Sequence, residues 1–247
     1  MATPPPSADS HSPTRGALAA AIVTLAGTPD HSSTVDRLLL TIAVLTADRV
    51  AAVRYTSVTA LRGRTYTTVA VSDELIRAVD EIQYADSAGP CVEAVDTGVP
   101  VGVPDIAATV QWPGFHEMAP RLGLHASVSV PLYAGRGVPV AALNVYGHDR
   151  AAMAPLIAGI CSLHAHPTDD LPGDGDVPGL DEGGRELVLG CAEALGIRAT
   201  IRLATDMIMT SLHCTADDAY LSLCIRAGAA GLDLADAAAT LIAGDRL

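Results

Sequence analysis

The chain has 247 residues, 28 of them acidic and 15 basic, which gives a net charge of −13. Every basic residue is arginine, and the absence of lysine excludes a Walker-type phosphate loop and Schiff-base chemistry, because both need a lysine amine. A chain this acidic repels nucleic acid unless its basic residues gather in a local patch.

The chain begins with a Pro- and Ser-rich stretch, residues 1–14, which we expect to be disordered. Hydrophobic spacing then predicts helices at 16–27 and 33–46, the second entered through Ser33 or Thr34. The remaining elements expected up to residue 166 are strands at 49–56 and 65–72 joined by a turn at 57–64, a helix at 74–83, a strand at 99–105, strands at 125–133 and 138–147 joined by a turn at 134–137, and a helix at 153–166. This order is typical of an antiparallel sheet with helices packed on it, an α+β fold.

Residues 167–184 are mostly Pro, Gly and Asp, and we predict an acidic linker there. Beyond it every segment is helical in pattern, which predicts a small all-α domain over 185–247. The features expected in that domain are a first helix ending at Gly196, a second at 201–212 with an apolar stripe of Ile201, Ala204, Ile208 and Leu212, a third at 215–228 capped by Thr215 and Asp218, and a fourth at 233–244. Helices this short bury little alone, so we expect packing on a partner, with a homodimer as the first candidate.

The five cysteines bear on where the protein resides. They are Cys91, Cys161, Cys191, Cys214 and Cys224. Their odd number and the lack of CxxC spacing indicate free thiols in a reducing compartment. Residues 15–27 have the arginine and short apolar run of a signal peptide, but a second helix pattern follows directly. No run reaches the ~18 apolar residues of a membrane span, so we expect a cytoplasmic protein without membrane contact.

Several motifs of the first domain arrive in a characteristic order. They are Gly89-Pro90-Cys91, DTGVPVGVPD at 96–105, Trp112 with Phe115, SVPLY at 129–133 and AALNVYG at 141–147. In this the region 15–166 resembles the GAF family, of the kind found in actinobacterial sensor-regulators. One departure is that Ser87 and Ala88 stand where relatives usually have Gly-Glu. The resemblance implies a GAF-like antiparallel sheet with flanking helices and a small-molecule pocket on one face.

The helical region 197–244, from RATIRLATDMIM to LADAAATLI, resembles the ANTAR family, named for transcription antitermination. The resemblance implies a three-helix output domain that binds paired RNA hairpins as a dimer. Three departures remove positive charge: Ala204-Thr205-Asp206 replaces Ala-Lys-Gly, Cys224-Ile225 replaces basic residues after Leu223, and Gly231–Leu234 replaces a basic cluster.

The charges that remain in the helical region are few. Residues 199–247 contain three arginines and six aspartates. The candidates for contact with RNA are Arg198, Arg202 and Arg226. RNA binding depends on neutralising phosphates, so we expect the affinity to be weakened or lost.

Cys91 follows Pro90 at the expected first turn of a helix, where the helix dipole lowers a thiol pKa. A thiol redox sensor is therefore one hypothesis. Nothing nearby in the sequence supplies a cation or a resolving thiol, so we interpret Cys91 as a buried pocket wall. The ligand-binding candidates are Cys91, Trp112, His125 and Tyr146, with core packing or surface filling as the alternative interpretation.

Catalytic and metal chemistry find little support. Cys161, His164 and His166 have metal-binding residue types, but they lie at a helix end where the dipole alone favours histidine. Asp80 and Glu81 are interpreted as a solvated helix face. We expect no enzyme, no metal and no cofactor. The sequence predicts a sensor coupled to an RNA-binding antitermination output, with a protein-interaction or dimerisation module, or a thiol switch, as alternatives.

Overall fold

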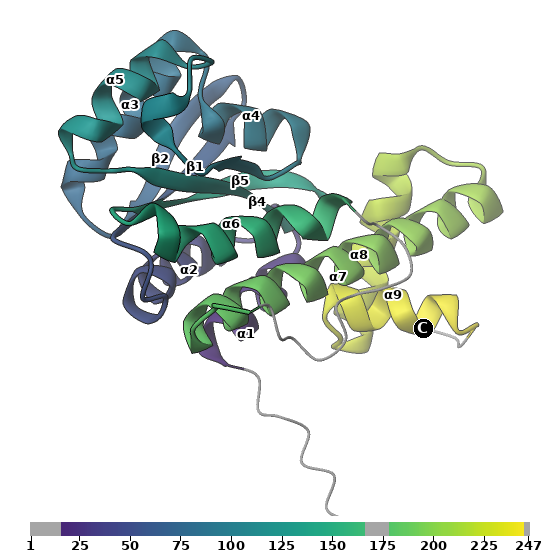
Figure 1. The fold of residues 1–247 in the computed structure, drawn as a ribbon. Coiled ribbons are helices and arrows are strands. Elements are labelled where there is room, and N and C mark those ends of the chain that lie inside the picture. The colour runs from purple at the N-terminus through teal and green to yellow at the C-terminus, as the bar shows by residue number, and fades with distance from the viewer. Residues whose placement is uncertain (1–15, 166–177, 245–247) are drawn as a thin grey trace, which may run out of the picture.

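The structure is a computed structural model and describes residues 16–165 and 178–244. The segment predicted to be disordered, 1–14, and most of the predicted linker lie outside the described residues. A five-stranded antiparallel sheet lies at the centre, in the order β2-β1-β5-β4-β3 (Figure 1). Its strands are β1 (Tyr55–Arg62), β2 (Thr65–Val71), β3 (Val101–Val103), β4 (Ala126–Ala134) and β5 (Val138–Gly147). The expected α+β class is confirmed.

Helices cover both faces of this sheet (Figure 1). On one face lie α1 (Ala17–Ala26), α2 (Val35–Arg49), α6 (Arg150–Ala165) and the N-terminal half of α7 (Glu182–Leu212). On the other face lie α3 (Arg77–Asp86), α4 (Pro90–Thr97) and α5 (Pro113–Arg121), with the short 3-10 turns η1 (Glu74–Ile76) and η2 (Ile106–Ala108). The arrangement is a three-layer helix–sheet–helix unit.

The first strand was predicted in the wrong place. Residues 57–62, expected to be a turn, form most of β1, and the hairpin closes at Gly63 and Arg64. The polar residues of this stretch alternate with Val58 and Ala60, both fully buried. A strand with polar residues on one face has a composition similar to that of a turn, so composition alone predicts a turn here.

One face of the sheet is aliphatic, and α1, α2, α6 and α7 pack against it. The strand residues on that surface are Val58, Ala60, Val128, Val130, Leu132, Leu143 and Val145, each at most 2% exposed. They recur at every second position, so each strand directs one set of side chains to this core. This surface holds α7 in place.

The helix α7 is continuous over 31 residues, so the expected stop at Gly196 is wrong. Packing of both its halves overrides the weak helix propensity of one glycine. Residues 182–184, expected in the linker, form its first turn, and Asp181 caps them by accepting from the Gly184 N–H at 2.8 Å. Glu186 accepts from the Leu18 N–H at 3.0 Å and from Arg49, which joins α7 to α1 and α2. The boundary predicted at residue 185 stays a prediction.

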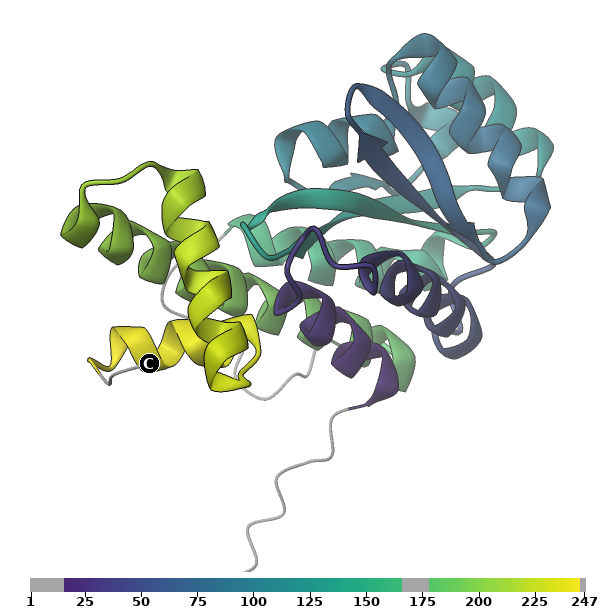
Figure 2. The same cartoon turned by 180° about the vertical axis from the view of Figure 1, so that it is seen from behind.

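The C-terminal half of α7 forms a second core with α8 (Ala216–Ala230) and α9 (Leu234–Ile242), and we call residues 201–244 the helical tail. Figure 2 shows this tail grouped at one end of the molecule, beside the sheet. Ile201, Ala204 and Ile208 are buried as expected, whereas Leu212 is 56% exposed, contrary to the predicted stripe. The Thr215 cap is confirmed, since its hydroxyl accepts from the Asp218 N–H at 3.2 Å.

Candidate ligand-binding site

The face of the sheet under α3 and α4 is polar although it is buried. Its residues are Ser57 and Thr59 of β1, Ser127 and Ser129 of β4, and Asn144 and Tyr146 of β5, each at most 2% exposed. Strand pairing places Ser57, Asn144 and Ser129 side by side across β1, β5 and β4. We call these six residues the polar face. Small polar side chains in the middle of a sheet are costly to bury without partners, so their hydrogen bonds decide what this face does.

Asp80 of α3 is the centre of these hydrogen bonds. Its carboxylate is fully buried and accepts from Ser57 Oγ at 2.9 Å, Thr68 Oγ1 at 2.9 Å and Tyr146 OH at 3.2 Å. Among the described residues, no arginine or histidine forms an ion pair with it. Burial raises the pKa of Asp80 to about 6, against the lowering effect of the three hydroxyl donors and of the charge on Arg77. A buried carboxylate whose charge is only partly offset therefore lies beside the polar face.

Two atoms of the polar face have no hydrogen-bond partner among the residues that the structure describes. Asn144 donates from Nδ2 to Ser57 Oγ at 3.0 Å and to Thr59 Oγ1 at 2.9 Å, but its Oδ1 is buried and unpaired. Ser127 Oγ is likewise buried and unpaired. Leaving a buried polar atom unpaired costs about 1–3 kcal/mol. Such atoms are satisfied when a water or a ligand group binds beside them.

The hydrogen-bond network extends to the helices. Tyr84 OH lies 2.9 Å from Thr59 Oγ1 and 2.8 Å from Thr68 Oγ1. Gln83 accepts from the Cys91 N–H at 3.1 Å and so connects α3 to the first turn of α4. These contacts hold the two helices at a defined distance from the sheet.

Cys91 lies in the first turn of α4, beside this network, and is completely buried. Burial raises the pKa of its thiol far above the usual value, and the neighbouring Asp80 carboxylate raises it further. The helix N-terminus that could lower the pKa is outweighed by the loss of water. The thiol is therefore protonated, and its role as a pocket wall stays a prediction.

The four residues predicted to bind a ligand do not share one environment in the structure. Tyr146 lies on the polar face and Cys91 beside it, whereas Trp112 belongs to the adjoining apolar cluster and contacts Phe115 edge-on at 6.4 Å between ring centroids. Tyr146 belongs to that same cluster. His125 is exposed, and its backbone N–H and carbonyl pair with Gly147 and Ile106.

The interpretation of Asp80 as a solvated residue is wrong, because its carboxylate is the centre of the buried network. Sequence reasoning also missed Asn144 and Ser127. The signal that could have found them is the regular alternation of polar and aliphatic residues in β1, β4 and β5. It predicts one polar and one apolar face on strands that are buried on both sides.

The three arginines expected to contact RNA have different surroundings. Arg198 of α7 donates from Nε to the Gly137 carbonyl at 2.6 Å and lies over the Tyr133 ring at 4.3 Å. Arg202 and Arg226 are exposed. One of the three is thus engaged within the molecule.

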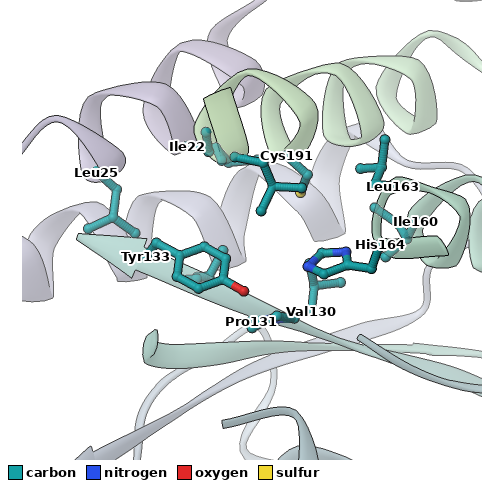
Figure 3. Close-up of a pocket in the computed structure, with 12 residues that line it drawn as sticks. Ile22, Leu25, Val130, Pro131, Tyr133, Ile160, Leu163, His164 and Cys191 are labelled. Carbon is teal, nitrogen blue, oxygen red and sulfur yellow. The ribbon is translucent and has the colours of Figure 1, made fainter. Parts of the chain in front are cut away.

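A small cavity lies on the opposite, aliphatic face, between β4, α1, α6 and α7 (Figure 3). Its free volume is about 10 Å³, room for about one water molecule. Figure 3 shows Tyr133 and His164 across the cavity from each other, with Cys191 on the α7 side. Both His164 ring nitrogens are buried and have no hydrogen-bond partner within the described part of the chain, and burial together with nearby Arg198 lowers the pKa of this histidine.

The described residues contain neither a metal-binding cluster nor a membrane-spanning helix. Within residues 16–165 and 178–244, no three His, Cys, Asp or Glu side chains gather closely enough to hold a metal ion. His166 of the candidate metal set lies outside the described residues. None of the described helices is long and apolar enough to span a bilayer.

The five-stranded antiparallel sheet with helices on both faces defines an α+β domain. Comparison with known families matches residues 29–155, more than half of the chain, to the GAF domain. The chain therefore belongs to the GAF domain family, whose members commonly bind small molecules.

A similar solved structure is that of a type II free methionine-R-sulfoxide reductase from Thermoplasma acidophilum. It has 13% identity and a TM-score of 0.39, and the match covers 57% of this chain and 89% of that one. Similarity at this level carries no inference about activity. No match to the sequence is found among curated proteins.

Proposed function

We propose that the protein is a cytoplasmic signal-sensing regulator in which a small molecule binds at the polar face and the helical tail provides the output. The role is one of binding rather than catalysis. The observation that supports it is the pair of buried, unpaired atoms on the polar face, Asn144 Oδ1 and Ser127 Oγ. The free cysteines among the described residues agree with a reducing compartment.

The chemistry of the polar face indicates what it would bind. Asn144 Oδ1 and the Asp80 carboxylate are acceptors, and the Ser127 hydroxyl can donate or accept. Acceptors therefore predominate, and a ligand that presents N–H donors would satisfy them. Compounds such as nucleobases, amides and small amines have such donors, whereas simple carboxylates would be repelled by the negative charge of Asp80.

The test measures thermal unfolding in the presence of free nucleobases, small amides and small amines. We expect at least one compound to raise the Tm of the wild type, and Asn144→Ala to weaken its binding by about tenfold, the cost of losing roughly one hydrogen bond. Ser162→Ala changes an exposed serine of α6 and serves as the control. Equal binding by Asn144→Ala and wild type, or no shift with any compound, would count against the polar face as the site.

For the output, the proposal is an RNA-binding antitermination activity of reduced affinity. It is supported by the ANTAR-like sequence pattern and by the exposure of Arg202 and Arg226. The reduction in affinity follows from charge, because residues 182–244 contain four arginines and eight acidic residues.

Fluorescence anisotropy with a two-hairpin RNA at low salt tests this output. We expect binding weaker than micromolar that falls steeply with salt and is lost in the double variant Arg202→Gln/Arg226→Gln. Arg64→Gln, at the exposed β1–β2 turn, removes the same kind of charge elsewhere. Micromolar or tighter binding would show that the missing basic residues matter less than proposed.

A second candidate function is protein interaction or homodimerisation through the tail. The observation that favours it is a set of large apolar residues on α7 and α8 that are at least 40% exposed: Leu203, Met207, Leu221 and Ile225. Sedimentation of the full chain over a range of concentrations gives the test. A dimer that dissociates in Leu221→Ser/Ile225→Ser but persists in Leu75→Ser would support this function, and a monomer throughout would contradict it.

A further inference from the structure

Helix α7 contributes to two separate apolar cores. The core on the aliphatic face of the sheet includes Leu187 and Ala194 of α7, and the tail core begins on the same helix at Ile201. Between them, Ile197 is partly buried and packs against both cores, and a Cβ at Gly196 would meet nothing within 4 Å. The tail is thus joined to the first core mainly through α7, with Ile197 as an apolar residue that contacts both cores.

The turn between β4 and β5, residues 134–137, contacts the helical tail, and we call this turn the hairpin tip. Arg136 forms ion pairs with Asp30, at 3.1 Å, and with Asp217 of α8, and it lies 4.9 Å above the Tyr220 ring. Tyr220 in turn donates to Asp30 Oδ1 at 3.1 Å. The tip is therefore enclosed by α8 on one side and by the loop between α1 and α2 on the other.

Glycine is required within this contact. Gly135 has a φ of +50°, and a Cβ there would lie 2.1 Å from Tyr220 OH. Only a residue without a side chain allows Tyr220 to approach the backbone so closely. Next to it, Arg198 of α7 binds the Gly137 carbonyl, so the tip contacts both α7 and α8.

From these contacts we infer that the hairpin tip is a releasable latch that fixes the helical tail against the sheet. The ion pairs of Arg136 are partly exposed, since the side chains of Arg136, Asp30 and Asp217 are 43%, 22% and 81% accessible, whereas Tyr220 is buried in the tail core. Exposed ion pairs are individually weak, because water competes for both partners. The latch can therefore open while both apolar cores stay intact.

The latch also has a physical connection to the polar face. The hairpin tip joins β4 and β5, the strands that contain Ser127 and Asn144. Beside the tip, Tyr133 donates to the Gly98 carbonyl at 2.6 Å, immediately after α4. A ligand that moves β4, β5 or α4 would displace the tip; this coupling rests on the proposed function, whereas the latch itself does not.

Cys224 of α8 reports whether the latch is open. It is partly buried beside Tyr220, with Asp30 and Arg136 close by. Alkylation of the full-length protein by iodoacetamide, followed by peptide mass spectrometry, gives its rate relative to Cys214 of the same tail. Release of the tip exposes Cys224 and leaves Cys91 and Cys191 buried.

Two variants open the latch in different ways, and each has a matched control. Arg136→Gln removes the ion pairs, and Gly135→Ala pushes Tyr220 away without changing charge. The controls are Arg64→Gln and Gly63→Ala at the β1–β2 turn, where Gly63 has a φ of +65° and no atom within 4 Å of a Cβ. We expect both test variants to label Cys224 at least about threefold faster, as for a local opening, with no change in the controls.

The sign of the effect separates exposure from electrostatics. Arg136 lowers the pKa of Cys224, so its loss alone would slow alkylation. Acceleration in Arg136→Gln therefore reports exposure. Wild-type rates in both test variants, equal acceleration in the controls, or faster labelling of Cys91 and Cys191 together with Cys224 would each overturn the latch.

Discussion

Gly190 of α7 lies directly against Ala19 of α1, so closely that a Cβ on Gly190 would fall 2.8 Å from the Ala19 Cα. Gly196 is six residues further along the same helix, and a Cβ there would meet nothing. Both glycines have helical backbone conformation, but Gly190 is packed tightly against another helix whereas Gly196 faces open space. They show why the N-terminal half of α7 belongs to the first core.

This difference predicts opposite effects of alanine at the two positions. Gly190→Ala should destabilise the protein by about 1–3 kcal/mol, because helix α1 must move away. Gly196→Ala should stabilise it by about 0.5–1 kcal/mol through helix propensity alone. Urea unfolding of both variants measures the difference. A stabilised Gly190→Ala variant would mean that α1 and α7 do not pack as described.

The apolar skeleton of this fold could be predicted from the sequence. Runs such as 125–133 and 138–147 contain aliphatic residues at every second position and became β4 and β5. The prediction failed where tertiary packing overrides local preference. Gly196 did not end its helix because both halves of α7 are held by different cores, and β1 was missed because Ser57 and Thr59 face a polar surface rather than solvent.

The candidate site was less predictable, since it is built from residues that are ordinary in sequence. Asp80 looks like a solvated helical acid until the register of β1 and β5 places Ser57 and Tyr146 beneath it. Cys91 was recognisable by its position after Pro90, but its protonation state depends on burial. Burial of polar groups depends on long-range pairing, which single-sequence patterns do not report.

The carboxyl of Asp80 should make stability depend on pH. Its pKa rises from 3.8 to about 6 on folding, so the folded protein binds a proton more readily than the unfolded chain between those values. Stability from this group therefore increases as pH falls from about 6 to about 4, and the full penalty is present above pH 6. At about 1.4 kcal/mol per pKa unit, the penalty is on the order of 3 kcal/mol.

Asp80→Asn removes this titration. We expect the stability difference between Asp80→Asn and wild type to become less favourable to the variant, by roughly 2–3 kcal/mol, from pH 8 to pH 4. Urea unfolding over that range measures it, with Asp48→Asn on the surface as the control for charge. A difference that stays constant with pH would show that Asp80 is solvated.

His164 should make stability depend on pH in the opposite direction. Burial and Arg198 lower the pKa of its imidazole below 6.5, so the unfolded chain takes up the proton first as the solution is acidified. Stability from this group is complete above about pH 6.5 and is lost as pH falls below that value. His164→Leu should therefore be at least as stable as wild type at pH 7.5, and its advantage should grow towards pH 5.

Thermal unfolding at several pH values provides the measurement, with His125→Leu at an exposed position as the control. The buried nitrogens of His164 have no partner among residues 16–165 and 178–244, so we expect their removal to cost no hydrogen bond. A marked loss of stability in His164→Leu at pH 7.5 would show that the imidazole has a bound partner in solution.

The thiol of Cys91 should resist oxidation and alkylation. Complete burial and the nearby Asp80 carboxylate raise its pKa, and each unit of increase reduces the reactive thiolate about tenfold. Under mild peroxide we expect peptide mass spectrometry to find Cys214, which is partly exposed, modified well before Cys91. In urea both thiols should react at similar rates, because unfolding removes the difference in burial. Sulfenic acid on Cys91 at the rate of Cys214 in the folded protein would restore the redox-sensor hypothesis, since it would require a thiolate that the buried network does not permit.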